Sequence, residues 1–342
     1  MTVRVNKQPF NIREKLSELE RPIGVKGTEL MRAETAQDAR DLVSAGRKNL
    51  IINGAMEVAQ RNTSLTGRTD SATVLTVDRF HHHASGGTFN TSQQTVTNGG
   101  MPGLPIKFKN YLKFDVTTGA NNCGVWHTIE DVRTVQGLHT YSFYARGTNP
   151  SSGHYELDFR QYFGSGGSST TELTYDDIVL TSDWQRYTFT FTPESLSGKT
   201  IGANSYFRMF LRQPDADNTT NAYSFEITGV QLEAGGNATD FEHRSYGEEL
   251  ALCQRYYQVH DGHYLQVVSP TTGSNADFYN TLAYWVPMRD TPDVSQSYTN
   301  SGASTNNLVT VTATKAKFSL RPSNANTEVY VRADTLRLDA EL

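Results

Sequence analysis

The sequence has few of the features that anchor a chain in a membrane or cross-link a small secreted scaffold. Its 342 residues include only two cysteines, Cys123 and Cys253, which are too few for a disulfide framework. No apolar run approaches the roughly 18 residues of a membrane-spanning helix, so membrane insertion is not expected. The N-terminus has no apolar signal-peptide core, and we therefore expect the protein to leave its cell by lysis rather than by secretion.

Basic charge and catalytic motifs are also scarce. The formal net charge is −5, which argues against a nucleic-acid partner because such partners select a basic surface. The chain has no Gly-x-Ser-x-Gly elbow, no phosphate-binding loop and no paired CxxC motif. We therefore expect a protein that is not an enzyme and that needs no cofactor.

What the chain does contain is typical of a mainly β protein. Thr, Ser, Asn, Gly and Tyr are plentiful and charged residues are only 20% of the total, as in folds with many strands and tight turns. Around residues 222–232, Tyr223, Phe225 and Ile227 alternate with polar residues in the period of a half-buried strand.

A helix is predicted directly after this strand. Ser245 stands three residues before Glu248, which is the pattern of a capping box at a helix N-terminus. An apolar stripe on one face of the helix is then expected from residues spaced by four, three and four positions, namely Tyr246, Leu250, Cys253 and Tyr257.

Composition and residue patterning divide the chain into four parts. Residues 1–48 carry 10 Lys/Arg against 7 Asp/Glu and contain two short capped helical patterns, which predicts a basic helical arm that needs a partner. Residues 49–240 predict a jelly-roll β-sandwich, residues 241–258 a linking helix, and residues 259–342 a small C-terminal β-sandwich.

The strands expected in the larger sandwich begin with an apolar segment at 49–58 that is broken by Asn53-Gly54. Ten further strands are expected near 73–83, 87–97, 110–116, 123–131, 138–146, 154–163, 170–174, 186–192, 204–212 and 222–232.

Several segments resemble known proteins. NLIINGAMEV, DRF, WHTIEDVRTVQGLHTYSFYARG, LTSDWQRYTFTFT and FEITGVQLEAG resemble jelly-roll domains of the carbohydrate-binding-module or galactose-binding type. Together with ATDFEHRSYGEELALCQRYYQ, VPMRDTPDV and the lead-in NIREKLSELERPIGVKGTELMRAETAQDARDL, they resemble tail-fibre and related appendage proteins of short-tailed marine, cyanophage-like phages. This resemblance implies a homotrimeric virion appendage and implies no activity residue by residue.

One strand pattern carries the candidate binding site. In HYELDFRQYF, alternate residues place polar groups on one face and apolar groups on the other. Carboxylates, guanidinium groups and an aromatic ring on one face suit a glycan, although a solvated face with cross-strand ion pairs fits the same pattern. The candidate glycan-binding residues are His154, Glu156, Asp158, Arg160 and Tyr162, joined by Arg208 and Arg212 from a second strand whose register the sequence leaves open.

Other functional interpretations of single residues have less support in the sequence. Glu156 and Asp158 could suggest a glycosidase, but neighbouring same-face residues of a strand splay into water, and no pocket is indicated. His81-His82-His83 point to alternating faces and predict no metal site. Structural calcium at Asp176-Asp177 or at Asp215 and Asp217 is a further alternative to exposed turn acids. Trp126, Trp184 and Trp285 are expected in the core, as is Cys253.

The expected partners follow from this organisation. We expect a homotrimer, because both the arm and the small C-terminal unit have little core of their own. Residues 1–48 are expected to attach to a phage tail, portal, nozzle or adaptor protein, and host cell-surface polysaccharide is a possible ligand of the sandwich. A head or capsid decoration protein without receptor binding, a secreted glycan-binding module and a polysaccharide depolymerase are the alternatives.

Overall fold

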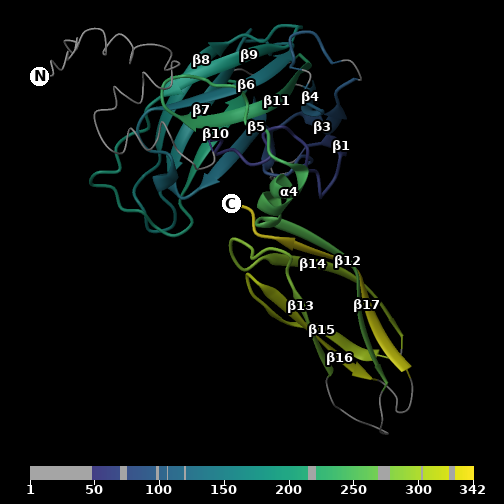
Figure 1. Ribbon diagram of the computed structural model, residues 1–342. Helices are drawn as coiled ribbons and strands as arrows, with labels where there is room; N and C mark the ends of the chain where they lie inside the picture. The colour runs from purple at the N-terminus through teal and green to yellow at the C-terminus, as the bar shows by residue number, and fades with distance from the viewer. Residues whose placement is uncertain are drawn as a thin grey trace, which may run out of the picture. The chain divides into compact units, whose positions relative to one another are not determined.

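Figure 1 shows a computed structural model of the chain. The structure describes residues 48–69, 75–97, 100–105, 107–118, 121–214, 221–268, 278–301, 303–322 and 328–342. By internal contacts the chain divides into two compact units, Met1–Lys48 and Asn49–Leu342. The helical arm predicted for residues 1–48 lies outside the described residues except for Lys48, and the predicted domain limits remain predictions.

Two antiparallel sheets form the larger part of the second unit (Figure 1). One sheet has six strands, in the spatial order β1 (Ser64–Arg68), β3 (Thr88–Thr95), β4 (Asn110–Thr118), β11 (Tyr223–Ala234), β6 (His139–Gly147) and β9 (Gln185–Phe191). The other has five strands, in the order β2 (Phe80–Ser85), β5 (Asn121–Glu130), β10 (Tyr206–Arg212), β7 (Tyr155–Tyr162) and β8 (Thr171–Ile178). The predicted jelly-roll sandwich is confirmed in these terms.

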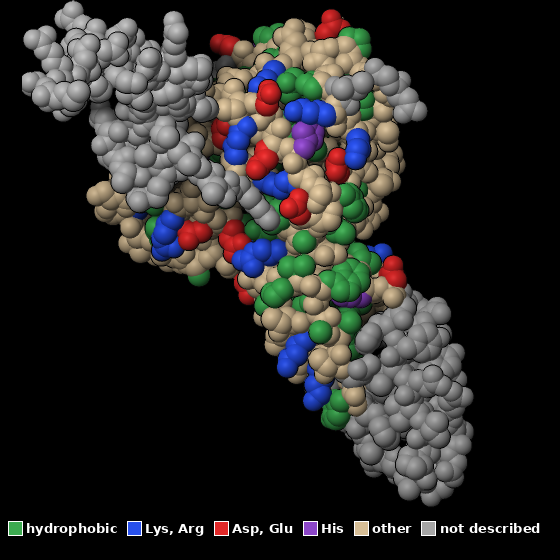
Figure 2. All heavy atoms as spheres, in the orientation of Figure 1, with side chains coloured by type: hydrophobic (Ala, Val, Ile, Leu, Met, Phe, Trp, Pro, Cys, Tyr) green, Lys and Arg blue, Asp and Glu red, His purple; other side chains and the backbone are tan. Residues whose placement is uncertain are grey.

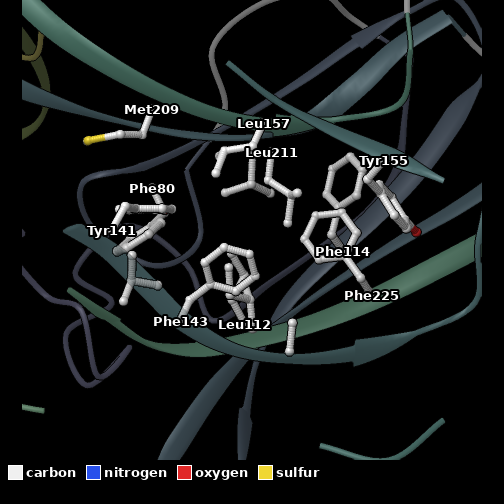
Figure 3. Packing of buried hydrophobic residues seen from close by; sticks show 14 of the residues in the cluster. Phe80, Leu112, Phe114, Tyr141, Phe143, Tyr155, Leu157, Met209, Leu211 and Phe225 are labelled. Atoms are coloured by element: carbon white, nitrogen blue, oxygen red, sulfur yellow. The ribbon is translucent and has the colours of Figure 1, made fainter. Parts of the chain in front are cut away.

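The core lies between these two sheets, where side chains of β7 and β10 face side chains of β4, β6 and β11 (Figure 3). Leu157 of β7 and Leu211 of β10 are both almost fully buried, as are Phe143 of β6 and Phe225 of β11. Alternation is therefore the direct cause of the sandwich, since each strand presents every second side chain to this layer.

The segment Asn49–Val58, predicted as a strand, is instead a loop that is held by two buried asparagines. The side-chain oxygen of Asn49 accepts hydrogen bonds from the backbone of Ile51 and of Leu232. The amide of Asn53 donates to the carbonyls of Val58 (2.8 Å) and Asp78 (2.9 Å). These side chains make the backbone hydrogen bonds that a neighbouring strand would otherwise make, so this apolar segment can be a buried loop.

The predicted helix is confirmed as α4 (Tyr246–Gln254), with both hydrogen bonds of the Ser245–Glu248 capping box. The predicted apolar stripe is partly wrong, because Tyr246 is 55% exposed and Tyr257 belongs to the next strand. Cys253 is buried as expected, and it shares the buried face with Glu249, whose carboxylate accepts a hydrogen bond from the backbone of Asn53 (2.5 Å). The helix is thus docked through a polar contact that a hydrophobic pattern does not indicate.

After α4 the chain forms two small sheets of three strands each. One contains β12 (Tyr257–Val268), β17 (Glu328–Asp339) and β14 (Asp293–Ser301), and the other contains β13 (Phe278–Ala283), β16 (Lys315–Pro322) and β15 (Ala303–Val311). Phe318 of β16 and Leu336 of β17 belong to one buried apolar cluster, so the two sheets pack on each other. Among the described residues no helix combines the length and the apolar character that crossing a membrane would take.

A fully buried arginine lies where the large sandwich meets the C-terminal residues. Arg79 is fully buried, its guanidinium lies 3.5 Å from the centre of the Tyr256 ring, and it forms an ion pair with Glu341. His81 lies beside this pair, with its Nε2 atom 3.7 Å from the Glu341 carboxylate. His127 donates from Nε2 to the carbonyl of Ile52 (3.1 Å), which requires the Nε2–H tautomer or the cation.

Both histidines are held neutral. Burial and, next in size, the positive charge of Arg79 lower the pKa values of His81 and His127 well below the ordinary 6.5. Burial has the opposite effect on two acids, raising the pKa values of Asp78 and Glu249. The charged neighbours of the two histidines are Arg79, Arg61, Arg244 and Glu341.

We predict that the free energy of unfolding falls as the pH is lowered below about 6.5. In that range the unfolded chain binds protons at these two histidines and the folded chain does not, so each contributes a loss of up to about 1.4 kcal/mol per pH unit. The raised pKa values of Asp78 and Glu249 act in the opposite direction, because the folded chain takes up protons at these carboxylates at a higher pH than the unfolded chain does. Urea denaturation between about pH 7 and pH 5.5 measures the slope.

His127→Gln, which keeps a donor for the Ile52 carbonyl, is expected to remove about half of the slope. His154→Gln is the matched control, since the His154 side chain is 26% exposed and lies just before β7. A slope unchanged by His127→Gln, or reduced equally by His154→Gln, contradicts the prediction.

Candidate functional site

The candidate site is the outward face of the five-stranded sheet, where β7 and β10 lie side by side. In their antiparallel register Arg208 is opposite Arg160, and Arg212 is opposite Glu156. The structure therefore brings Glu156, Asp158, Arg160, Tyr162, Arg208 and Arg212 together on one face. His154 precedes β7, with its Nδ1 atom 3.8 Å from Asp177, and it contacts none of the others through a described ion pair.

A buried carboxylate organises the charges of this face. Asp158 is fully buried, and its Oδ2 atom accepts hydrogen bonds from Arg160 (2.8 Å) and from Nε of Arg212 (2.7 Å). Its other oxygen accepts from the hydroxyl of Thr174 (2.9 Å). Arg212 also pairs with Glu156 at 2.7 Å. The expectation that Glu156 and Asp158 splay into water was therefore wrong, because one guanidinium draws both toward it.

Arg160 completes a second set of contacts. Its guanidinium is 2.8 Å from Asp158 and 2.9 Å from Glu172 of β8. These two carboxylates keep the pKa of Arg160 above its usual value despite the opposing effect of burial. Cross-strand ion pairs were foreseen for this face, but a fully solvated face was not confirmed, since Asp158 and Arg212 are buried.

Arg208 is placed among aromatic rings instead of carboxylates. The central carbon of its guanidinium is 5.1 Å from the ring centres of Tyr162 and Phe210, and 5.4 Å from that of Trp126. Trp126 and Phe210 meet edge to face at 5.2 Å. A guanidinium over ring faces is stabilised by the ring quadrupoles, by about 0.5–2 kcal/mol for each good contact.

We define the aromatic platform as Trp126, Tyr162, Tyr206 and Phe210 with Arg208 at its centre. Tyr162 and Tyr206 are stacked at 4.5 Å, and only Phe210 of the five is fully buried. Trp126 is partly exposed on this face, so its expected place in the core was wrong. The alternation in WHTIE could have indicated an outward Trp126, but only the β5–β10 register shows that it meets Phe210.

The other two tryptophans have different positions. Trp184 is buried as expected, but in a separate cluster with Phe108 and Tyr111 outside the main core. Trp285 is 61% exposed, so its expected core position was wrong. Its ring packs against that of His260, with ring centres 4.2 Å apart.

The residues considered for metal or calcium do not form a common site. His81 and His83 contact Trp126 on the outer face, whereas His82 stacks on Phe114 inside. Asp177 is 87% exposed; the side chain of Asp176 and residues Asp215 and Asp217 lie outside what the structure describes. Within the described residues no three His, Cys, Asp or Glu side chains are grouped closely enough to hold a metal ion.

Figure 2 shows the distribution of charge on one side of the molecule. On the described part of the sandwich, Lys/Arg and Asp/Glu side chains lie beside one another, interspersed with polar and apolar groups. Such a mixed surface suits a ligand that is recognised by individual contacts rather than by a large field of one sign.

No protein-family profile matches the chain, and no curated protein matches it. Solved structures show a distant similarity to carbohydrate-binding β-sandwich modules and to one phage tailspike domain. The N-terminal cellulose-binding domain of β-1,4-glucanase C of Cellulomonas fimi is 16% identical, with 43% of this chain and 90% of that domain covered and a TM-score of 0.27.

Two further similarities extend over about half of the chain. The enzymatically active domain of tailspike protein 4 of bacteriophage CBA120 is 10% identical, covering 54% of this chain and 21% of the tailspike, with a TM-score of 0.31. A Stig cyclase of Fischerella sp. TAU is 12% identical, covering 56% and 98%, with a TM-score of 0.35. Similarity this distant concerns the fold alone, and it says nothing about ligands.

We predict that Asp158→Asn lowers the free energy of unfolding by about 3 kcal/mol. The substitution removes the negative charge shared by Arg160 and Arg212, and Arg212 is only 4% exposed. Glu172→Gln is the matched control, because Glu172 contacts the same Arg160 from a side chain that is 39% exposed. Its loss should stay within about 1 kcal/mol; equal losses in the two variants, measured by urea denaturation, contradict the proposed role of Asp158.

Proposed function

We propose that the sandwich binds a saccharide on the aromatic platform. The observation that carries the proposal is that Trp126 and Tyr162 are partly exposed on either side of Arg208, with Arg160 and Glu172 beside them. Aromatic rings accept the apolar face of a sugar ring, while guanidinium groups and carboxylates hydrogen-bond its hydroxyls. Both kinds of group lie on neighbouring strands, which hold them rigidly.

We propose binding without hydrolysis. A glycosidase needs one carboxyl group that can give up a proton and a second that acts as nucleophile or base. Here Asp158 accepts hydrogen bonds from two arginines and a threonine, and Glu156 is paired with Arg212. Both carboxylates are therefore engaged by neighbouring side chains, which suits a role in positioning those side chains rather than in protonating a substrate.

We predict that Trp126→Ala weakens binding of host surface polysaccharide by about 30-fold or more, as expected for a central aromatic anchor. Isothermal titration calorimetry on the full chain measures the change. Trp285→Ala is the matched control, since that tryptophan is 61% exposed and lies outside the sheet. Binding unchanged in Trp126→Ala, or lost equally in both variants, contradicts the proposal; oligosaccharides released by the protein but not by Glu156→Gln would establish a depolymerase instead.

We further propose that the chain is an appendage of a phage virion, a tail fibre attached through residues 1–48. The sequence segments set out above support this, together with the charge of the arm: residues 1–48 have a net charge of +3, so the remainder of the chain has −8. A basic arm suits an acidic docking surface on a tail, portal or nozzle protein. Self-association as a homotrimer would give the arm and the small C-terminal sheets additional buried surface.

We predict that the full chain, of 38.0 kDa, has the mass of a trimer in mass photometry. Deleting residues 1–48 should leave a folded and soluble oligomer that no longer enters virions, because the basic arm supplies the attachment. A full chain that is monomeric at micromolar concentration contradicts the trimer. Virions that still contain the truncated protein contradict the attachment site, and cryo-EM density on the head rather than the tail would establish a capsid decoration protein.

A further inference from the structure

Arg208 differs from the other two arginines of the same face in having no carboxylate. Arg160 and Arg212 each contact two acids at 2.7–2.9 Å. Within the described residues Arg208 makes no ion pair or hydrogen bond, and its Nε atom is buried without an acceptor. A guanidinium carries five N–H donors, so ring faces alone leave its donor capacity unused.

The electrostatic surroundings make this position unfavourable for an isolated cation. Burial is the largest effect and lowers the pKa of Arg208; Tyr162, Tyr206 and Asp158 oppose this shift, whereas the positive charge of Arg160 adds to it. The two arginines are directly opposite each other in the β7–β10 register. An anion placed here would offset the cost of burying the Arg208 cation and its repulsion by Arg160.

The neighbouring acids do not fulfil this role, because each is already engaged. Asp158 is shared by Arg160 and Arg212, and Glu172 is held by Arg160 at 2.9 Å. Glu130, which lies beside Tyr206 in the β5–β10 register, accepts hydrogen bonds from Arg255 and Tyr256. The face therefore presents a cation with unused donors, whose neighbouring acids are each bonded to another group.

We infer that the saccharide bound on the aromatic platform is acidic, with a carboxylate or sulfate group received by Arg208. The inference rests on the proposed function of this face. A planar guanidinium offers two parallel N–H donors to such an oxyanion, and the pair gains strength from partial burial. Trp126, 5.4 Å from the guanidinium, would contact the sugar ring that carries the anion.

The experiment compares acidic polysaccharides with their uncharged forms. The full chain is titrated with polygalacturonate and its methyl ester, with alginate and carboxyl-reduced alginate, and with carrageenan and desulfated carrageenan. We expect at least one acid to bind about 10- to 100-fold more tightly than its uncharged form, which is the range of one charge-assisted hydrogen bond. The pairs distinguish a carboxylate from a sulfate, and the preference should weaken at high salt.

Arg208→Gln is expected to abolish the preference, because it should lower the affinity for the acid about 10- to 100-fold more than the affinity for the uncharged form. Arg133→Gln is the matched control, since Arg133 is 60% exposed and pairs with Asp131 away from the platform. Thermal unfolding of both variants shows whether they are folded.

The outcomes separate this inference from the proposed function. Equal binding of acidic and uncharged forms, with loss in Trp126→Ala, overturns the acidic ligand and leaves saccharide binding in place. An equal loss for both forms in Arg208→Gln shows that Arg208 only supports the rings, and also overturns the inference. If neither these polysaccharides nor the host surface polysaccharide binds, the inference and the proposed function fail together.

Discussion

The outward face of the five-stranded sheet depends on one buried carboxylate, that of Asp158. Two guanidiniums converge on a single oxygen of this group, at 2.7 and 2.8 Å. Because Asp158 is fully buried, removing its charge would leave Arg212 buried beside a neutral group. The ion pairs of Asp158 therefore fix side chains of β7 and β10. They also determine which arginine of the face has no carboxylate bonded to it.

The position of Arg208 follows from this constraint. Strand alternation puts three arginines and two acids on the outer faces of β7 and β10, and β8 adds Glu172. Asp158 and Glu156 bind Arg212, while Asp158 and Glu172 bind Arg160. The guanidinium of Arg208 contacts the rings of Trp126, Tyr162 and Phe210 instead. A cation on an aromatic surface is thus the product of local pairing rather than of net charge, which is negative for the chain.

The parts of this structure that follow from short-range pattern could be predicted from the sequence. The alternation in β7 and β11 and the capping box of α4 are properties of adjacent residues, and they were found where the pattern placed them. The segment Asn49–Val58 was misassigned because Asn49 and Asn53 bind backbone groups up to 183 residues away. β1 was missed because SLTGR has little apolar character and lies at the edge of its sheet.

Only the part of the candidate site that lies on a single strand could be predicted from the sequence. The polar row on β7 can be read from its own period, but Trp126 and Thr174 join it only through the pairing of β5 with β10 and of β7 with β8. Register depends on contacts between strands that are far apart in sequence, and a shift by one residue would turn each side chain to the opposite face. Burial of Asp158 is equally non-local, since a carboxylate is buried only where partners from other strands compensate its charge.

One row across the sheet connects the platform to the residues near the C-terminus. His81, Trp126, Phe210, Asp158 and Thr174 are consecutive partners in the ladder from β2 to β8. His81 stacks on Trp126 at 5.6 Å and lies 3.7 Å from Glu341. Trp126 therefore contacts both the neutral imidazole of His81 and the guanidinium of Arg208. Because burial holds His81 neutral, its stacking on Trp126 adds no second positive charge next to the guanidinium of Arg208.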